Sequence, residues 1–181
     1  MSLLATIAMY GLGLGFIYAG GVFAPLSDLG AMVAALTLMA AVQEVYRALA
    51  PSRPRLNPLA RRVGMGGAGV TAAASGALVV LDALGRERLA GLALRMQLSA
   101  GLAQGSYFGL VSLLTARTGR WSRAVAGSAA LAAGGYLAGS VLALRGDLTS
   151  PALTASFLAS LGGFGAWALL IRSEESRRDL A

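Results

Sequence analysis

The chain has 181 residues, of which 56% are hydrophobic and only 13% are charged, and its mean hydropathy is +0.69. A soluble domain is usually about 45–50% apolar and about 25% charged, so this composition indicates a membrane protein whose long uncharged runs cross the hydrocarbon as helices. Cysteine and histidine are both absent, which excludes disulfides, cysteine catalysis, thiolate metal sites and haem held by histidine.

The net charge is +7, because 15 basic residues outnumber 8 acidic ones, and all of the basic residues are arginine. In a soluble protein such a charge would favour a nucleic-acid partner. Here the arginines lie between apolar runs. We therefore assign them to membrane topology and to contact with anionic lipids, and we expect no nucleic-acid partner.

The first two apolar runs, residues 3–24 and 29–50, are each long enough for one membrane span. A cleaved signal peptide is the alternative for the first run. That run lacks a basic segment before it and exceeds the usual length of a signal sequence, so we favour a retained span. The second span ends in a polar third, where Glu44 and Arg47 can pair on one helix face.

Residues 51–62 form a break rich in proline and arginine, which predicts an irregular loop between two spans. The third predicted span is 63–84, and it opens on several glycines. Residues 89–95 are apolar up to an arginine and are interpreted as an interfacial lead-in. The fourth span is then 96–116.

The fourth span combines small residues with two amides. Its glycines recur at every fourth position, which predicts a stripe where helix backbones approach closely: Gly101, Gly105 and Gly109. Gln97 and Gln104 lie on nearly the same face. We favour interhelical hydrogen bonds for these amides over the lining of a cavity, and we expect this span to be the central helix.

The fifth span is 124–144, with Gly135 and Gly139 in packing spacing around Tyr136. The sixth span is 151–171. A charged tail follows it, which predicts a short solvated continuation of that helix with an ion pair between Glu174 and Arg178, four residues apart.

The predicted fold is therefore all-α, a single domain over residues 1–181 that forms an integral membrane bundle of six transmembrane helices. Eleven arginines fall in the second and fourth loops and the tail, against four in the other loops. This asymmetry predicts cytoplasmic N- and C-termini and a multi-pass protein of the cell (plasma) membrane. Trp121 and Trp167 are expected at the cytoplasmic interface as aromatic anchors.

An enzymatic role is not expected. Ser106 stands between glycines, but a nucleophile elbow needs glycine two residues earlier, and that position is Gln104. The sequence offers no histidine as a base and no lysine for a dyad. We therefore expect no catalytic residues, no cofactor and no bound metal.

Two functional hypotheses remain. The first is a non-catalytic structural or accessory membrane protein that forms a homo-oligomer or joins a membrane-protein partner. The alternative is a small transporter or channel, which would require a hydrated polar site formed by Glu44, Gln97, Gln104, Tyr107 and Tyr136. An intramembrane carboxylate is a functional candidate by default, although Glu44 also fits a structural ion pair near the membrane surface.

Four short segments carry a resemblance to a known family: YFGL at 107–110, TGRW at 118–121, GGYL at 134–137 and AWALLIR at 166–172. Together they resemble the C-terminal pattern of bacterial six-span membrane proteins grouped as an uncharacterised domain family. The resemblance covers residues 105–172, and the first half agrees only in hydropathy. It implies six spans and no established activity, and it identifies no site residues.

Overall fold

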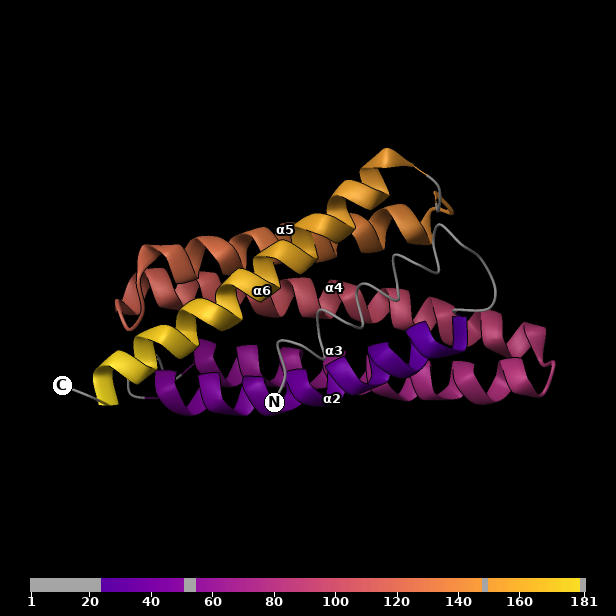
Figure 1. Ribbon diagram of the computed structural model, residues 1–181, viewed down its shortest axis with the longest axis horizontal. Coiled ribbons are helices and arrows are strands. Elements are labelled where there is room, and N and C mark those ends of the chain that lie inside the picture. Colours follow the sequence, from indigo (N-terminus) through magenta and orange to yellow (C-terminus); the bar gives the residue numbers. More distant parts are fainter. Residues whose placement is uncertain (1–23, 51–54, 148–149, 180–181) are drawn as a thin grey trace.

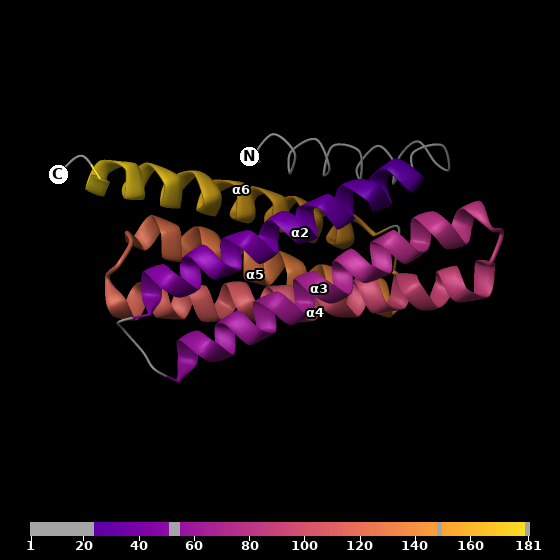
Figure 2. The same ribbon diagram turned by 90° about the horizontal axis from the view of Figure 1, so that it is seen from below.

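The computed structural model describes residues 24–50, 55–147 and 150–179, and these form five helices (Figure 1). They are α2 (Ala24–Leu49), α3 (Leu56–Ala83), α4 (Glu87–Thr118), α5 (Arg123–Leu144) and α6 (Pro151–Asp179). Helices adjacent in sequence pack side by side, so α4 lies between α3 and α5 (Figures 1 and 2). We call the end where α2, α4 and α6 finish the basic end, and the end where they begin the opposite end.

The prediction of a bundle of six transmembrane helices is wrong. Among the five described helices, four are long and apolar enough to cross a membrane: Asp28–Leu49, Leu56–Ala83, Arg123–Leu144 and Pro151–Arg178. The predicted fourth span is the exception, because the glutamines, serines and tyrosine of α4 lower its mean hydropathy. The predicted first span, residues 3–24, lies outside the described residues except for Ala24, which begins α2.

Two predicted boundaries also differ from the structure. Helix α3 begins at Leu56, inside the predicted loop, because Pro58 falls in the first turn, where a missing N–H breaks no helical hydrogen bond. Helix α4 begins at Glu87, so the predicted lead-in belongs to the helix. Arg95 is exposed on the helix surface and leaves the helix unbroken. Both helices therefore continue through a residue, Pro58 in α3 and Arg95 in α4, that was predicted to lie outside the span.

The centre of the core is an aromatic cluster around Phe108, which is completely buried. Its ring lies edge-on to Tyr107 at 5.2 Å and to Trp167 at 5.2 Å, and it stacks on Tyr136 at 5.8 Å. Phe164 of α6 completes the cluster. Trp167 is only 2% exposed, so it packs in this core instead of anchoring the helix at a membrane interface as predicted.

Helices α5 and α6 touch through their backbones. A methyl group on Gly135 would lie 2.6 Å from the carbonyl oxygen of Ser156 and 2.7 Å from the Cα of Ser160. A methyl group on Gly163 would lie 2.8 Å from the Cα of Ala132. Glycine on each helix therefore accepts the backbone of the other, the close approach that small residues permit between membrane helices.

Candidate functional site

The two glutamines of α4 lie in a polar seam with α3, which we define as Thr71, Ser75, Gln97 and Gln104. Gln97 Nε2 donates to Ser75 Oγ at 3.0 Å, and Gln104 Nε2 donates to Thr71 Oγ1 at 2.9 Å. Ser75 is completely buried, and Gln104 is buried as well. Both amides thus join neighbouring helices, as the interhelical interpretation predicted.

The two predicted site tyrosines have different surroundings from the polar seam. Tyr107 is buried with its ring against Gly64 of α3. Its hydroxyl has no hydrogen-bond partner in the part of the chain that the structure describes. Tyr136 of α5 stacks on Phe108 in the aromatic cluster. Tyr136 therefore packs in that cluster, whereas Tyr107 follows Gln104 by about one turn of α4 and takes no part in the hydrogen bonds of the seam.

Glu44 lies on the outside of the bundle. Its side chain is 74% exposed, and its carboxylate pairs with Arg47 at 3.1 Å, which confirms the predicted pairing. The five predicted site residues therefore do not converge. Two surface grooves, of about 460 and 350 Å³, are present in the described bundle, and none of the five lines either of them.

The glycine stripe of α4 faces α5, on a different side from the amides. A methyl group on Gly105 would lie 2.7 Å from Leu137 Cγ and 3.1 Å from the carbonyl oxygen of Ala133. Gly101 faces Ser140 of α5 in the same way. At the remaining predicted packing positions the fit is looser: a methyl group on Gly109 would lie 3.9 Å from Ala133 Cβ, and one on Gly139 would lie 3.5 Å from Ser156 Cβ. The stripe thus determines how closely α4 approaches α5.

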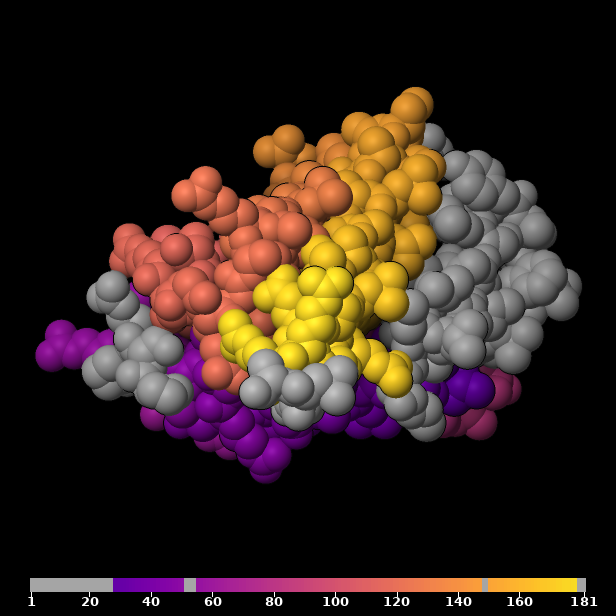
Figure 3. All heavy atoms as spheres, turned by 60° about the vertical axis from the view of Figure 1, so that its left-hand side comes forward, coloured from indigo at the N-terminus to yellow at the C-terminus, as the bar shows by residue number. Residues whose placement is uncertain are grey.

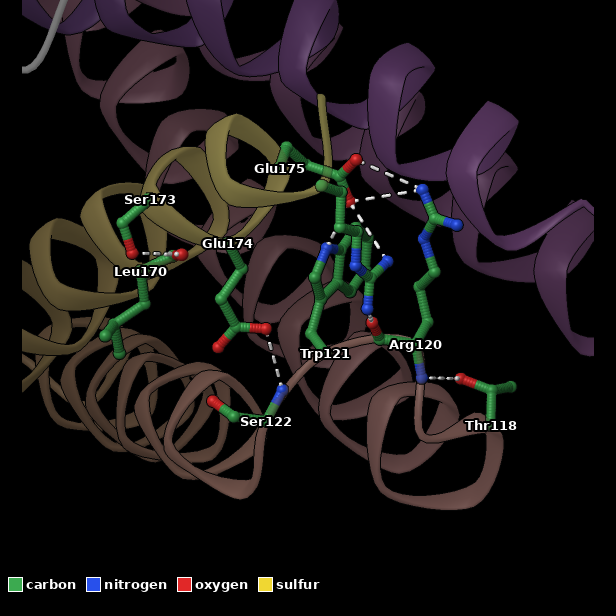
Figure 4. Close-up of polar contacts among 9 residues, drawn as sticks. Thr118, Arg120, Trp121, Ser122, Leu170, Ser173, Glu174 and Glu175 are labelled. Carbon is green, nitrogen blue, oxygen red and sulfur yellow. Dashed lines mark hydrogen bonds and ion pairs between the residues drawn. The ribbon is translucent and has the colours of Figure 1, made fainter. Parts of the chain in front are cut away.

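A cluster that the sequence did not predict joins the end of α6 to the α4–α5 loop (Figure 4). We call it the C-terminal clamp: Arg120, Trp121, Glu174, Glu175 and Arg178. The Glu175 carboxylate accepts from Trp121 Nε1 at 2.7 Å and from Arg120 Nη2 at 3.1 Å. Arg178 Nη1 lies 3.6 Å from it. Trp121 is only 4% exposed, so it is also not the interfacial anchor that we predicted.

Glu174 completes the clamp by capping α5. The backbone N–H of Ser122 donates to Glu174 Oε2 at 3.0 Å, while Ser122 Oγ accepts from Val125 N at 3.4 Å. In a capping box an acid three residues after the cap would accept the first of these bonds. Val125 occupies that position, and α6 supplies the carboxylate instead. The charged tail therefore is a bound continuation of α6, and Arg178 pairs with Glu175 in place of the predicted Glu174.

The charges divide unequally between the two ends of the bundle. Among residues whose side chains the structure describes, the basic end holds ten arginines and three acids: Arg47, Arg55, Arg61, Arg62, Arg117, Arg120, Arg123, Arg172, Arg177 and Arg178, with Glu44, Glu174 and Glu175. The opposite end holds four of each: Arg86, Arg88, Arg95 and Arg145, with Asp28, Asp82, Glu87 and Asp147. The net positive charge of the described side chains is thus concentrated at the basic end. In Figure 3 that end is turned forward, and the last turns of α6 lie beside the α4–α5 connection.

These features define an all-α protein in which four of the described helices are long and apolar enough to cross a membrane. Comparison of the chain with models of protein families, with curated proteins and with solved structures finds no match. The resemblance of residues 105–172 to an uncharacterised membrane family stays a prediction.

The polar seam permits a direct energetic test. The Gln104→Leu and Thr71→Val variants, alone and combined, are expected to show a coupling free energy of about 0.5–1 kcal/mol, the usual value for a hydrogen bond between membrane helices. Unfolding by denaturing detergent, followed by circular dichroism, measures it. Ser106→Ala is the control, because the Ser106 hydroxyl donates to Leu102 of its own helix. Additive effects of the two substitutions would show that the bond contributes nothing.

Proposed function

We propose that this protein is a multi-pass protein of the cell membrane with a non-catalytic, structural or accessory role. The observation that carries the proposal is that the polar residues expected to line a transport site are engaged elsewhere. Gln97 and Gln104 bond to α3, and Glu44 pairs with Arg47 on the outer surface. The absence of cysteine, histidine and lysine from the sequence also supports a non-catalytic role.

The outer surface of the bundle suits lipid. Large aliphatic side chains are exposed on all five described helices, among them Leu36, Val70, Leu113, Leu131 and Leu158. Several hydroxyls donate to carbonyls of their own helix, so they need no water. Examples are Ser99 to Arg95 and Ser156 to Ala152, both at 2.8 Å.

The connections between helices imply that α4 crosses as well. Helices α3 and α5 both run from the basic end to the opposite end, and both are candidate spans. Since α4 joins the end of α3 to the start of α5, it returns across the membrane between them. Its polar residues are tolerated there because the neighbouring helices satisfy them.

The distribution of arginine supports an orientation with the basic end in the cytoplasm, against the anionic leaflet. Single-cysteine labelling tests it, because the chain has no cysteine of its own. In intact cells, a membrane-impermeant maleimide is expected to label Leu84→Cys at the opposite end and to leave Ser176→Cys at the basic end unlabelled. After the cells are opened, both should react. Labelling of Ser176→Cys alone in intact cells would contradict this orientation.

The role itself is tested by photo-crosslinking in living cells from exposed positions such as Leu36 of α2 and Leu158 of α6. A structural or accessory role predicts a defined adduct with one membrane protein or with a second copy of this chain. Solute flux in reconstituted vesicles is the opposing measurement. Flux that is present in the native chain and lost in both Glu44→Gln and Gln104→Leu would contradict the proposal and favour a transporter.

A further inference from the structure

The larger of the two surface grooves lies between α3 and α4 and has a volume of about 460 Å³. Gly66, Gly67 and Val70 line its α3 side, and the α4 side includes Arg95 and Ala103. The helices touch at its floor, because a methyl group on Gly67 would lie 2.9 Å from Ala103 Cβ. A methyl group on Gly66 would meet no atom within 4 Å. The groove is therefore open to the surroundings at Gly66 and closed beneath at Gly67.

The groove extends from the phosphate level of one leaflet into the hydrocarbon of that leaflet. About 20 helical residues cross the hydrocarbon, and counting back from Arg117 at the basic end reaches Leu98. Arg95 then lies one turn beyond, at the level of the phosphates in the opposite leaflet. From Leu98 to Ala103 the helix rises about 8 Å, about half of the roughly 15 Å thickness of one leaflet's hydrocarbon.

Arg95 gives one end of the groove an unpaired charge. Its side chain is exposed and forms no ion pair or hydrogen bond with any residue that the structure describes. The Ser99 hydroxyl beside it donates to the Arg95 carbonyl and leaves the guanidinium free. A guanidinium presents donors in a planar fork that matches phosphate oxygens. A cationic end at the phosphate level and an apolar groove that continues into the hydrocarbon together complement a phosphate group and the first part of an acyl chain.

We propose that this groove binds one phospholipid of the opposite leaflet, with an acyl chain along α3 and α4 and the phosphate on Arg95. The inference rests on the proposed membrane function and specifies a ligand for this face. A second copy of the chain fits less well, because packing an apolar helix here would cover Arg95 without supplying a negative charge. Anionic headgroups are preferred, because no acidic side chain that the structure describes neutralises the Arg95 guanidinium.

Photo-crosslinking with phosphatidylglycerol that carries a diazirine on its acyl chain tests the proposal in lipid nanodiscs. Adducts are mapped by mass spectrometry and are expected on the groove residues of α3 and α4. Gly66→Leu should fill the groove and abolish these adducts. Gly69→Leu is the matched control, because it adds the same side chain to the same helix at another open position outside the groove.

The charge is tested with Arg95→Gln, with Arg88→Gln as the control at the same end. Arg95→Gln is expected to reduce the preference for phosphatidylglycerol over phosphatidylcholine by about fivefold, the contribution of one arginine near an anionic surface. Equal behaviour of Gly66→Leu and Gly69→Leu would overturn the proposal. Adducts at Leu36 of α2 report contact with lipid in general, so their absence would instead contradict the membrane function itself.

Discussion

Replacing Gly135 with alanine is expected to lower the free energy of unfolding by about 2–3 kcal/mol, in the upper range for overpacking a tightly packed interior. The new methyl group would lie 2.6 Å from the Ser156 carbonyl oxygen and 2.7 Å from the Ser160 Cα. Both atoms belong to the backbone of α6, so no side-chain rotation relieves the contact. Helix α6 has to move away from α5, which also loosens the aromatic cluster that contains Phe164 and Trp167.

The control for this experiment is the neighbouring residue. Gly134→Ala introduces the same methyl group where no atom lies within 4 Å. It should leave stability unchanged or raise it by up to about 1 kcal/mol, since alanine favours the helix over glycine. Denaturing-detergent titrations followed by circular dichroism compare the two variants. If Gly135→Ala were as stable as Gly134→Ala, the backbones of α5 and α6 would not be in direct contact at Gly135.

Removal of the Glu175 carboxylate is expected to have the second large effect. Glu175→Ala leaves the Nε1 of the buried Trp121 without its acceptor, which typically costs about 1–3 kcal/mol. The ion pair with Arg120 is partly exposed, with side chains 39% and 34% accessible, so solvent screening limits its own contribution to below about 1 kcal/mol. Together these losses predict a destabilisation of about 2–3 kcal/mol.

Two measurements check the clamp. Unfolding titrations compare Glu175→Ala with Glu44→Ala, which breaks an ion pair whose side chains are 72% and 74% exposed and should cost less than about 1 kcal/mol. Fluorescence in a Trp167→Phe background follows Trp121 alone, and its emission should shift to longer wavelength when the clamp opens to water. A Glu175→Ala variant with the stability of Glu44→Ala and an unshifted emission would show that α6 is held without the clamp.

The clamp also bears on the proposed accessory role. It fixes the last turns of α6 to the α4–α5 loop at the end that carries the described net charge. The arginines of the surrounding surface, such as Arg117, Arg123 and Arg172, are exposed and remain directed outward. In the proposed orientation, this basic face is attracted to the anionic leaflet.

The polar residues show where prediction from the sequence reached its limit. The spacing of Gln97 and Gln104 placed them on one face of α4, and their hydrogen bonds to α3 follow from burial on that face. The spacing did not say which neighbour the face would meet. The prediction that Glu44 and Tyr136 lie beside these amides was wrong. The Glu44 side chain lies on the outer surface of the bundle, and Tyr136 packs in the aromatic cluster.

The clamp was beyond prediction for a related reason. Arg120 and Glu175 are 55 residues apart, and charged residues of both signs occur in many loops. Ser122 caps α5, but the acid that completes this cap comes from another helix. A local pattern cannot identify a partner that only the crossing of α4, α5 and α6 brings near.

The sequence by itself determined the all-α class, the apolar character, the boundaries of α5 to within one residue and the arginine asymmetry, because each depends on local periodicity and composition. Only the tertiary structure decided the continuation of α3 through proline and of α4 through arginine, and the use of the last turns of α6 as a clamp. It also left an unpaired Arg95 beside a groove. These features depend on which helix faces meet, and that choice is made by packing between residues distant in the chain.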